Sequence, residues 1–238
     1  MHTTDPSVRR PRSLTAEEAV SRLRALGTPA NVEGQARFAI NVSNSLGVSL
    51  GAIRGVAKQI GKNHELAGRL WATGIREAQI LASLVDDPGL VDDAQMEDWA
   101  KDFASWDVVD ACCCNLFDRT PQAYRKASEW SGREEEFVKR AAFSLMACLA
   151  VHDKKAPDER FEFLLAVLRE CCDDRNFVRK AISWALRQIG KRNAALNRMA
   201  VQAALEMRRI DCRGARWVAS DALRELESGA VQERLGRG

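Results

Sequence analysis

One helical face of the sequence combines cations with a large aromatic ring. Lys180, Trp184, Arg187 and Lys191 follow one another at spacings of 4, 3 and 4 residues, and positions three or four apart lie on the same side of an α-helix. Lysine and arginine attract phosphates, while an indole ring can lie against a sugar or a base. The pattern favours nucleic-acid binding. Two alternatives stay open: a plain solvated face, and a Trp184 that packs at the edge of the apolar stripe.

A second helical face places a carboxylate among apolar residues. We expect a helix to begin after Ser105, which would be its N-cap. Trp106 and Asp110 then share a face whose next turns carry Cys113 and Phe117. A carboxylate on such a stripe must be paired or functional, because leaving it bare would be costly. Asp110 is therefore either a reactive group or an aspartate that serves an ion pair or the helix dipole.

The elements that carry these faces are helices. Apolar residues recur with helical spacing almost throughout, and no stretch shows the period-two alternation of a half-buried strand. Thr15 and Glu18 form a capping box, and Ser49 caps a helix that ends at Gly61. Thr120-Pro121 indicates an N-cap followed by proline at the first helical position. These signals predict about a dozen short helices.

Internal similarity indicates that the helices are arranged in repeats. The segment FVKRAAFSLMACLA from Phe137 aligns with FVRKAISWALRQIG from Phe177, and ALRQI from Ala185 aligns with ALREL from Ala222. Helix pairs that recur at about 40 residues are typical of HEAT- or armadillo-like solenoids. We therefore predict an all-α fold, a right-handed HEAT-like α-solenoid of about six helix pairs.

The repeat also brings charged positions into correspondence. Arg140 and Lys180 occupy equivalent positions in successive units, as do Ser144 and Trp184. A cation at the same position of each unit would form a basic track on the concave surface, which a formal net charge of only +3 conceals.

Length and composition are ordinary for a globular protein. The 238 residues are expected to form a disordered N-terminal tail at 1–12, a single repeat domain at 13–228 and a C-terminal tail at 229–238. Seven cysteines without a signal peptide suggest a reducing cytosol. No apolar run approaches the roughly 18 residues that cross a membrane. We expect a monomer that is cytoplasmic and associated with the nucleoid.

Neither a metal nor a cofactor is predicted. The cysteines at 112–114 are consecutive, so their side chains fan out around a helix and cannot close on one ion, and those at 171–172 fail for the same reason. We interpret them as small core residues. His64 and His152 lack partners at zinc spacing, and no glycine-rich phosphate loop follows a strand.

Taken together, these motifs resemble the AlkD-like family of bacterial DNA alkylation repair proteins, all-helical HEAT-like repeat DNA glycosylases. The similarity covers about residues 31–227. It rests on the W-D-x-x-D motif from Trp106 to Asp110, the FVKR helix with Arg140, KAISWALRQIGKRN with Trp184, and the early LGVSLGAIRGVAK segment. In the family, two tryptophans and an aspartate face the lesion and an arginine helps to hold the DNA backbone. The resemblance implies those roles for Trp106, Trp184, Asp110 and Arg140.

The activity implied is hydrolytic excision of cationic alkylated purines from duplex DNA by a monofunctional DNA glycosylase. Such a base already leaves readily, so a carboxylate between aromatic walls would need only to stabilise an oxocarbenium-like sugar and position a water. The alternatives are a non-catalytic module for damaged or branched DNA and, more weakly, a protein-binding scaffold. Double-stranded DNA is the expected partner. The expected phosphate contacts are Arg54, Lys58, Lys139, Lys154, Lys155, Lys180, Arg187, Lys191 and Arg192.

Overall fold

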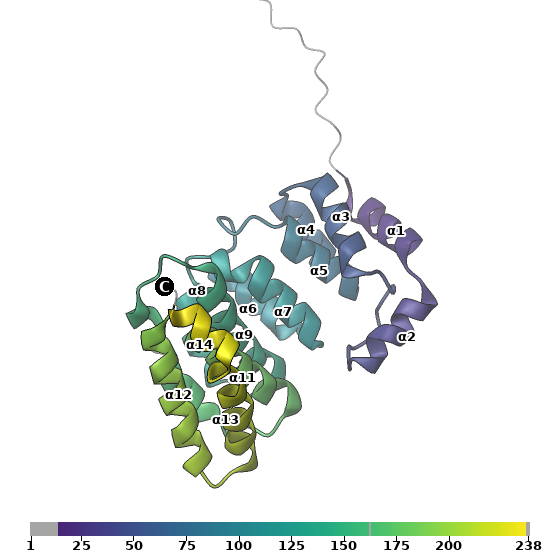
Figure 1. Ribbon diagram of the computed structural model, residues 1–238. Coiled ribbons are helices and arrows are strands. Elements are labelled where there is room, and N and C mark those ends of the chain that lie inside the picture. Colours follow the sequence, from purple (N-terminus) through teal and green to yellow (C-terminus); the bar gives the residue numbers. More distant parts are fainter. Residues whose placement is uncertain (1–13, 162, 237–238) are drawn as a thin grey trace, which may run out of the picture. The chain divides into compact units, whose positions relative to one another are not determined.

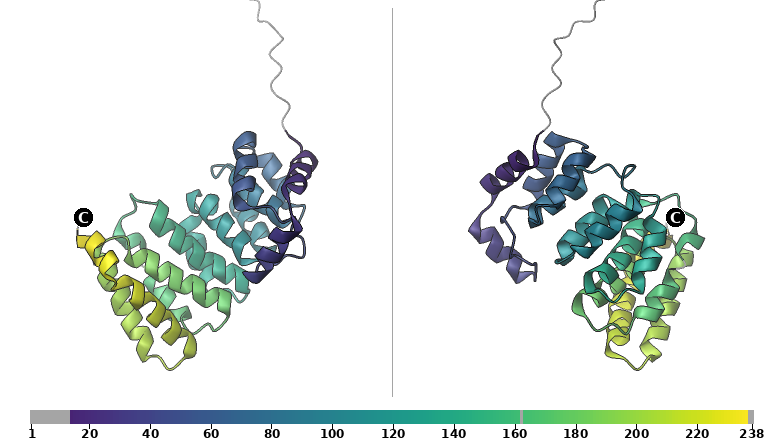
Figure 2. Two further views of the ribbon diagram at one scale, coloured as in Figure 1. Left: turned by 45° about the vertical axis from the view of Figure 1, so that its right-hand side comes forward. Right: turned by 180° about the vertical axis from the view of Figure 1, so that it is seen from behind.

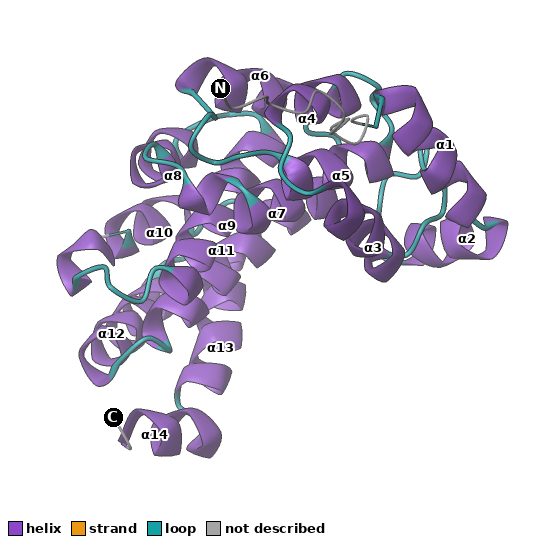
Figure 3. Cartoon of the chain, turned by 90° about the horizontal axis from the view of Figure 1, so that it is seen from above, coloured by secondary structure: helices purple, strands orange, loops and turns teal. Residues whose placement is uncertain are grey.

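The computed structural model describes residues 14–161 and 163–236, and every regular element within these ranges is a helix (Figure 3). The predicted all-α class is confirmed. The helices form two compact units, the first ending at Asp87 and the second beginning at Pro88. The expected tail at 1–12 lies outside the described residues, and a single domain over 13–228 stays a prediction. No described helix is long and apolar enough to span a bilayer.

The first unit contains five helices whose ends follow the local capping signals. Its elements are α1 (Ala16–Leu26), α2 (Pro29–Arg37), α3 (Leu50–Ile60), α4 (His64–Trp71) and α5 (Arg76–Val85). Both bonds of the capping box between Thr15 and Glu18 are present. The Ser49 hydroxyl accepts the amide of Ala52, and α3 ends at Gly61, whose φ of 74° suits glycine. Both predictions are confirmed.

A buried carboxylate on α5 fixes the loop between α2 and α3. Glu77 accepts the three consecutive amides of residues 46–48 at 2.8 to 3.2 Å, together with the Ser45 hydroxyl at 2.7 Å. Burial acts to raise the pKa of Glu77, but these donors and Arg76 outweigh it and hold the pKa below its usual value. One side chain therefore orders the segment that leads into α3.

The second unit is built around two long adjacent helices. Its elements are α6 (Asp93–Lys101), α7 (Trp106–Asn115), the 3₁₀ turn η1 (Phe117–Arg119), α8 (Ala123–Ser131), α9 (Glu136–His152), the 3₁₀ turn η2 (Asp158–Phe161), α10 (Leu164–Glu170), α11 (Asn176–Gly190), α12 (Ala194–Arg209), α13 (Arg213–Leu226) and α14 (Gly229–Gly236). The most extensive packing is between α9 and α11. Helices α7 and α8 also pack on α9, and α12 and α13 continue the stack beyond α11 (Figures 1 and 2).

The 40-residue sequence repeat corresponds to direct packing. Phe137 and Phe177, which begin the aligned segments, lie at the starts of α9 and α11, and their ring centres are 5.6 Å apart. Equivalent residues of successive units thus contact one another, as they do where similar units are stacked side by side.

Three element boundaries test the local predictions. The break before Trp106 is confirmed, although the Ser105 hydroxyl donates to Asp107 rather than capping a backbone amide. The N-cap assigned to Thr120 is wrong: its hydroxyl donates to the Phe117 carbonyl at 2.8 Å, and α8 begins only at Ala123. Residues of the expected C-terminal tail form α14, in which Arg234 and Gln232 donate hydrogen bonds to backbone carbonyls outside the helix.

Candidate functional site

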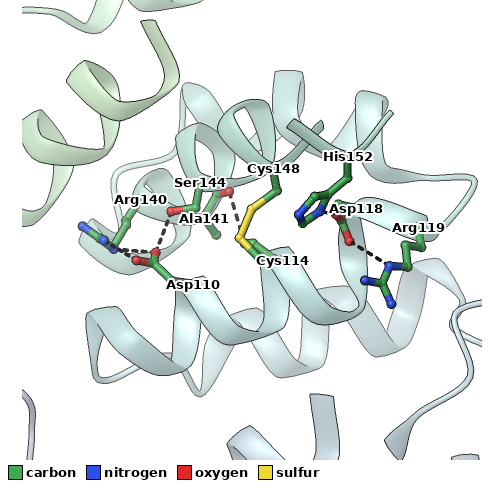
Figure 4. Close-up of a disulfide and its surroundings, with 10 residues drawn as sticks. Asp110, Cys114, Asp118, Arg119, Arg140, Ala141, Ser144, Cys148 and His152 are labelled. Atoms are coloured by element: carbon green, nitrogen blue, oxygen red, sulfur yellow. Dashed lines mark hydrogen bonds and ion pairs between the residues drawn. A yellow bond between two sulfur atoms is a disulfide. The ribbon is translucent and has the colours of Figure 1, made fainter. Parts of the chain in front are cut away.

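Asp110 lies on α7 and faces α9 across the seam between the two helices (Figure 4). Its Oδ1 accepts hydrogen bonds from Arg140 Nε at 3.1 Å and the Ser144 hydroxyl at 2.8 Å, and its Oδ2 accepts from Arg140 Nη2 at 2.7 Å. A carboxylate has about four acceptor positions, so the remaining one belongs to Oδ2. The side chain keeps 21% exposure. Asp110 is thus ion-paired with Arg140, and its role as a reactive group stays a prediction.

Arg140 connects three helices. Besides binding Asp110 on α7, it donates from Nη1 to the Phe177 carbonyl on α11 at 2.7 Å. Its guanidinium carbon lies 5.6 Å from the centre of the Trp106 ring, within range of a cation–π contact. Only 7% of its side chain is exposed. A guanidinium engaged in this way fixes the carboxylate and the indole. The contact between Arg140 and the DNA backbone that the resemblance implies stays a prediction.

Ser144 is the contact that the sequence interpretation missed. It lies one turn after Arg140 on α9, so the two side chains reach the same carboxylate. The spacing of four residues was visible in the sequence. A serine in an apolar helix, however, does not by itself indicate which group it will meet.

Trp184 lies on α11, at the repeat position equivalent to Ser144 on α9. The ring is partly buried. Its Nε1 donates to the Gln188 side-chain oxygen at 3.1 Å, in the amide orientation that also accepts from Lys191 Nζ at 3.2 Å. Among the described residues no hydrogen bond joins Trp184 to Asp110, so the pair of aromatic walls around that carboxylate stays a prediction.

Several of the predicted phosphate contacts already have partners within the chain. Lys139 is buried and its Nζ lies 2.8 Å from Glu170 and 3.6 Å from Asp173. Arg187 and Lys191 both bind Glu225, and with these partners the pKa of Glu225 lies below its usual value even though burial acts to raise it. These carboxylates offset the charges, so the predicted basic track is interrupted on α9 and α11.

A second group of predicted cations is exposed. In the first unit these are Arg54 and Lys58, both on α3; in the second they are Lys180 on α11 and the neighbouring Lys154 and Lys155 after α9. None of the five has an ion-pair partner among the residues that the structure describes. These five predicted phosphate contacts are exposed and available to a polyanion. Arg192, a further predicted contact, is partly buried and donates to the carbonyls of Ala150 and Ala156.

Two further contacts follow Asp110 along the seam between α7 and α9 (Figure 4). Cys114 and Cys148 form a disulfide one turn beyond the ion pair, and Asp118 binds His152 one turn further on. Burial raises the pKa of Asp118, and the hydrogen bond from His152 opposes this effect only in part. An ion pair and a disulfide thus join α7 to α9, and an aspartate–histidine pair joins the following 3₁₀ turn, η1, to the end of α9.

The interpretation of the clustered cysteines as small core residues is wrong for Cys172, which is exposed, and it did not include the disulfides that Cys114 and Cys172 form. Cys172 is bonded to Cys212, 40 residues later, and Cys114 to Cys148, 34 residues later. Both separations approximate the repeat length, so the pairing depends on the packing of successive units and leaves no local signal. The cysteines at 112, 113 and 171 take no part in these two disulfides and are buried, as expected of core residues.

No group of three or more histidine, cysteine or acidic side chains within the described ranges is arranged to hold a metal ion. The site is composed instead of one carboxylate, one guanidinium, one hydroxyl and aromatic rings. Such a set can orient a carboxylate and offer a flat apolar surface to a ring or a sugar.

Comparison with known proteins places the chain in a family. Residues 19–226 match the family model described as DNA alkylation repair enzyme. A solved structure, described as a new family of proteins related to the HEAT-like repeat DNA glycosylases with affinity for branched DNA structures, superposes with a TM-score of 0.73 at 20% identity. That match covers 89% of this chain and 96% of the other. No curated protein gives a significant match. The fold is thus the predicted HEAT-like α-solenoid, and the chain belongs to the DNA alkylation repair enzyme family.

Proposed function

We propose that this protein binds duplex DNA and excises cationic alkylated purines by hydrolysis, as a monofunctional DNA glycosylase that acts as a cytoplasmic monomer. The observation that carries the proposal is the fixed carboxylate of Asp110, held by Arg140 and Ser144 beside the Trp106 ring. A purine alkylated at N3 or N7 is cationic and departs without much help from an acid. The developing charge on the sugar is then the part of the reaction that a protein must stabilise.

Asp110 is the proposed catalytic residue. A carboxylate whose position is set before the substrate arrives needs no reorganisation when charge develops. Its remaining acceptor position, on Oδ2, is available to a water or to the sugar. Arg140 and Ser144 are positioning residues in this scheme, because each acts through Asp110. Trp106 and Trp184 would supply aromatic surface to the damaged nucleotide.

The exposed cations are the proposed contacts to the DNA backbone. Arg54 and Lys58 would serve the first unit, and Lys154, Lys155 and Lys180 the second. Each cation that meets a phosphate releases a counterion, so affinity should fall steeply as salt rises.

Binding without catalysis is the second candidate, and one observation favours it specifically. The same guanidinium that fixes Asp110 also offsets its charge, and a neutralised carboxylate stabilises a cationic sugar less. The structural relative described as having affinity for branched DNA fits this alternative.

The test is release of N3- and N7-methylpurines from methylated duplex DNA, compared between the wild type and Asp110→Asn. We expect release by the wild type and a loss of at least tenfold in the variant, which corresponds to about 1.4 kcal/mol of transition-state stabilisation. Ser144→Ala is the matched variant: it removes one positioning bond and keeps the carboxylate, so a smaller loss is expected.

The outcomes separate the two candidates. Equal release by the wild type and Asp110→Asn would reject Asp110 as the catalytic group. If no base is released while both proteins bind duplex with the same salt dependence, excision must be abandoned in favour of binding.

A further inference from the structure

The seam between α11 and α13 contains a second set of one tryptophan, one aspartate, one arginine and one serine. Trp217 and Asp221 are four residues apart on α13, and Arg179 and Ser183 are four residues apart on α11. Residues at this spacing share a helical face. The tryptophan and aspartate of the Asp110 site have the same spacing on α7, as have its arginine and serine on α9. We call the new group the α11–α13 set.

Two contacts of the Asp110 site recur in the α11–α13 set. The guanidinium carbon of Arg179 lies 5.0 Å from the centre of the Trp217 ring, and the equivalent distance in the Asp110 site is 5.6 Å. The Ser183 hydroxyl donates to Oδ2 of Asp221 at 2.6 Å, as a serine hydroxyl does to Asp110. Both seams thus combine an arginine over an indole with an aspartate that accepts from a serine.

The two sites differ in which cation binds the aspartate. At Asp110 the arginine beside the indole donates to both carboxylate oxygens. Asp221 instead accepts from Arg224 at Oδ1, and Arg187 Nε lies 3.5 Å from its Oδ2. The guanidinium of Arg179 forms no hydrogen bond or ion pair with the described residues, although its Nε is buried. The charge of Arg179 is therefore left without a carboxylate.

No other acidic residue of the two helices offsets that charge. Helix α11 contains none, and α13 contains only Asp221 and Glu225. Glu225 is already bound by Arg187 and Lys191. A partly buried cation that lacks a carboxylate favours an anionic ligand.

Two exposed cations belong to the same two helices. Lys180 follows Arg179 on α11, and Arg213 begins α13 one turn before Trp217. Neither has an ion-pair partner within the ranges that the structure describes. A cation in the first turn of a helix is unfavourable beside the positive end of the helix dipole, so Arg213 does not serve to stabilise α13. The surplus of positive charge on these helices suits a phosphate.

We propose that Arg179, held against the Trp217 ring, binds a phosphate of the DNA backbone. A guanidinium presents a planar fork of donors that matches two phosphate oxygens, and the indole face keeps that fork in one orientation. The backbone of DNA is the source of this phosphate, because Lys180, next to Arg179, is already a proposed backbone contact. The assignment rests on the proposed binding of duplex DNA, and it adds a contact point at the seam between α11 and α13.

The experiment measures the binding of a short undamaged duplex over a range of salt concentrations for Arg179→Ala, Arg179→Lys and the wild type. Arg179→Ala should weaken binding by about tenfold, the effect of one lost charge-assisted hydrogen bond, and lower the salt slope by about 1. Arg179→Lys keeps the charge but loses the planar fork and its contact with the indole. Its salt slope should match that of the wild type, while its affinity falls by roughly threefold.

Arg198→Ala is the matched control. Arg198 is exposed on α12 and has no ion-pair partner among the residues described, so this variant removes the same charge outside the α11–α13 set. Its affinity and salt slope should stay close to those of the wild type. All binding is measured well below the melting temperature of each variant, so that a loss reports the contact and not unfolding.

Two results would overturn the assignment. If Arg179→Lys binds the duplex as tightly as the wild type, the position needs only a charge, and a planar phosphate site is rejected. Equal losses in Arg179→Ala and Arg198→Ala would mean that only the net charge of the surface matters.

If the wild type binds no duplex, the proposed function itself fails, and a titration with inorganic phosphate tests the site independently. The readout is the indole N–H resonance of Trp217, assigned with Trp217→Phe. A shift that Arg179→Ala abolishes would keep the phosphate site but replace DNA by a small phosphate compound. No shift in the wild type would reject a phosphate site altogether.

Discussion

Replacing Asp110 by asparagine should destabilise the second unit as well as affect its chemistry, and the size of this effect follows from the contacts. The asparagine oxygen can keep the two bonds now made to Oδ1, from Arg140 Nε and the Ser144 hydroxyl. The amide nitrogen would replace Oδ2 and face Arg140 Nη2, so a charge-assisted bond at 2.7 Å becomes a donor facing a donor.

Two contributions set the size of the stability loss expected for Asp110→Asn. A hydrogen bond to a charged group contributes roughly 1.5–3 kcal/mol, and breaking a fully buried ion pair costs about 3–5 kcal/mol. Arg140 is almost completely buried, but Asp110 keeps 21% exposure, which places the expected loss near the lower of these ranges, at about 2–3 kcal/mol. For a unit of this size the melting temperature should fall by roughly 5–10 °C.

Urea denaturation followed by tryptophan fluorescence measures this loss, with the midpoint lowered and the slope unchanged. Asp98→Asn is the control, because Asp98 forms an ion pair with Lys101 in which both side chains are about two-thirds exposed or more. That pair is screened by solvent and its removal should leave the midpoint where it was. If Asp110→Asn shifts the urea midpoint as little as Asp98→Asn does, the reasoning is refuted. The ion pair of the buried Arg140 guanidinium would then contribute no measurable stability. The excision assay should be run well below the melting temperature of the variant.

Glu77→Gln should destabilise the first unit at neutral pH by about 2 kcal/mol. Because folding lowers the pKa of Glu77, the carboxylate stabilises the fold fully above its ordinary pKa. This stabilisation is lost as the pH falls through the pKa of the folded state. Hydrogen exchange of the amides at residues 46–48 should report this loss, and Glu33→Gln, at an exposed glutamate, is the control. If the difference in protection between the wild type and Glu77→Gln does not narrow in acid, the pKa argument is contradicted. Gly190→Ala should cost about 1–3 kcal/mol in thermal denaturation, because the added Cβ would lie 2.7 Å from Leu226 and 2.8 Å from Ala200. Gly55→Ala, which meets nothing within 4 Å on α3, should be neutral or stabilising, and equal effects of the two would exclude overpacking. Trp184→Ala should reduce the preference for damaged over undamaged duplex more than overall affinity; proportionate losses on both would deny the ring a role in lesion recognition.

Local physical chemistry was enough to predict the helices and much of their capping. The box at Thr15 and the helix from Ser49 to Gly61 depend on bonds within a few residues, so the sequence contains all that they need. The pairing of α9 with α11 was also foreseeable, because the repeat places Phe137 and Phe177 at equivalent positions that meet in the stack. Thr120 shows the limit of such signals: the chain forms a 3₁₀ turn first, and the hydroxyl serves that turn.

The sequence alone also identified Asp110 as a carboxylate in need of a partner, since its helical face is otherwise apolar. Which partner it has was decided only by the tertiary structure. Arg140 is 30 residues away, and from the sequence it could bind Asp110, a phosphate or both. In the structure its Nε and Nη2 groups donate to the two carboxylate oxygens of Asp110. The same holds for the disulfides, for the Glu77 loop anchor and for the lysines that Glu225 and Glu170 offset. Periodicity tells which side chains share a face, whereas charge compensation depends on which faces meet, and that is settled only when the helices pack.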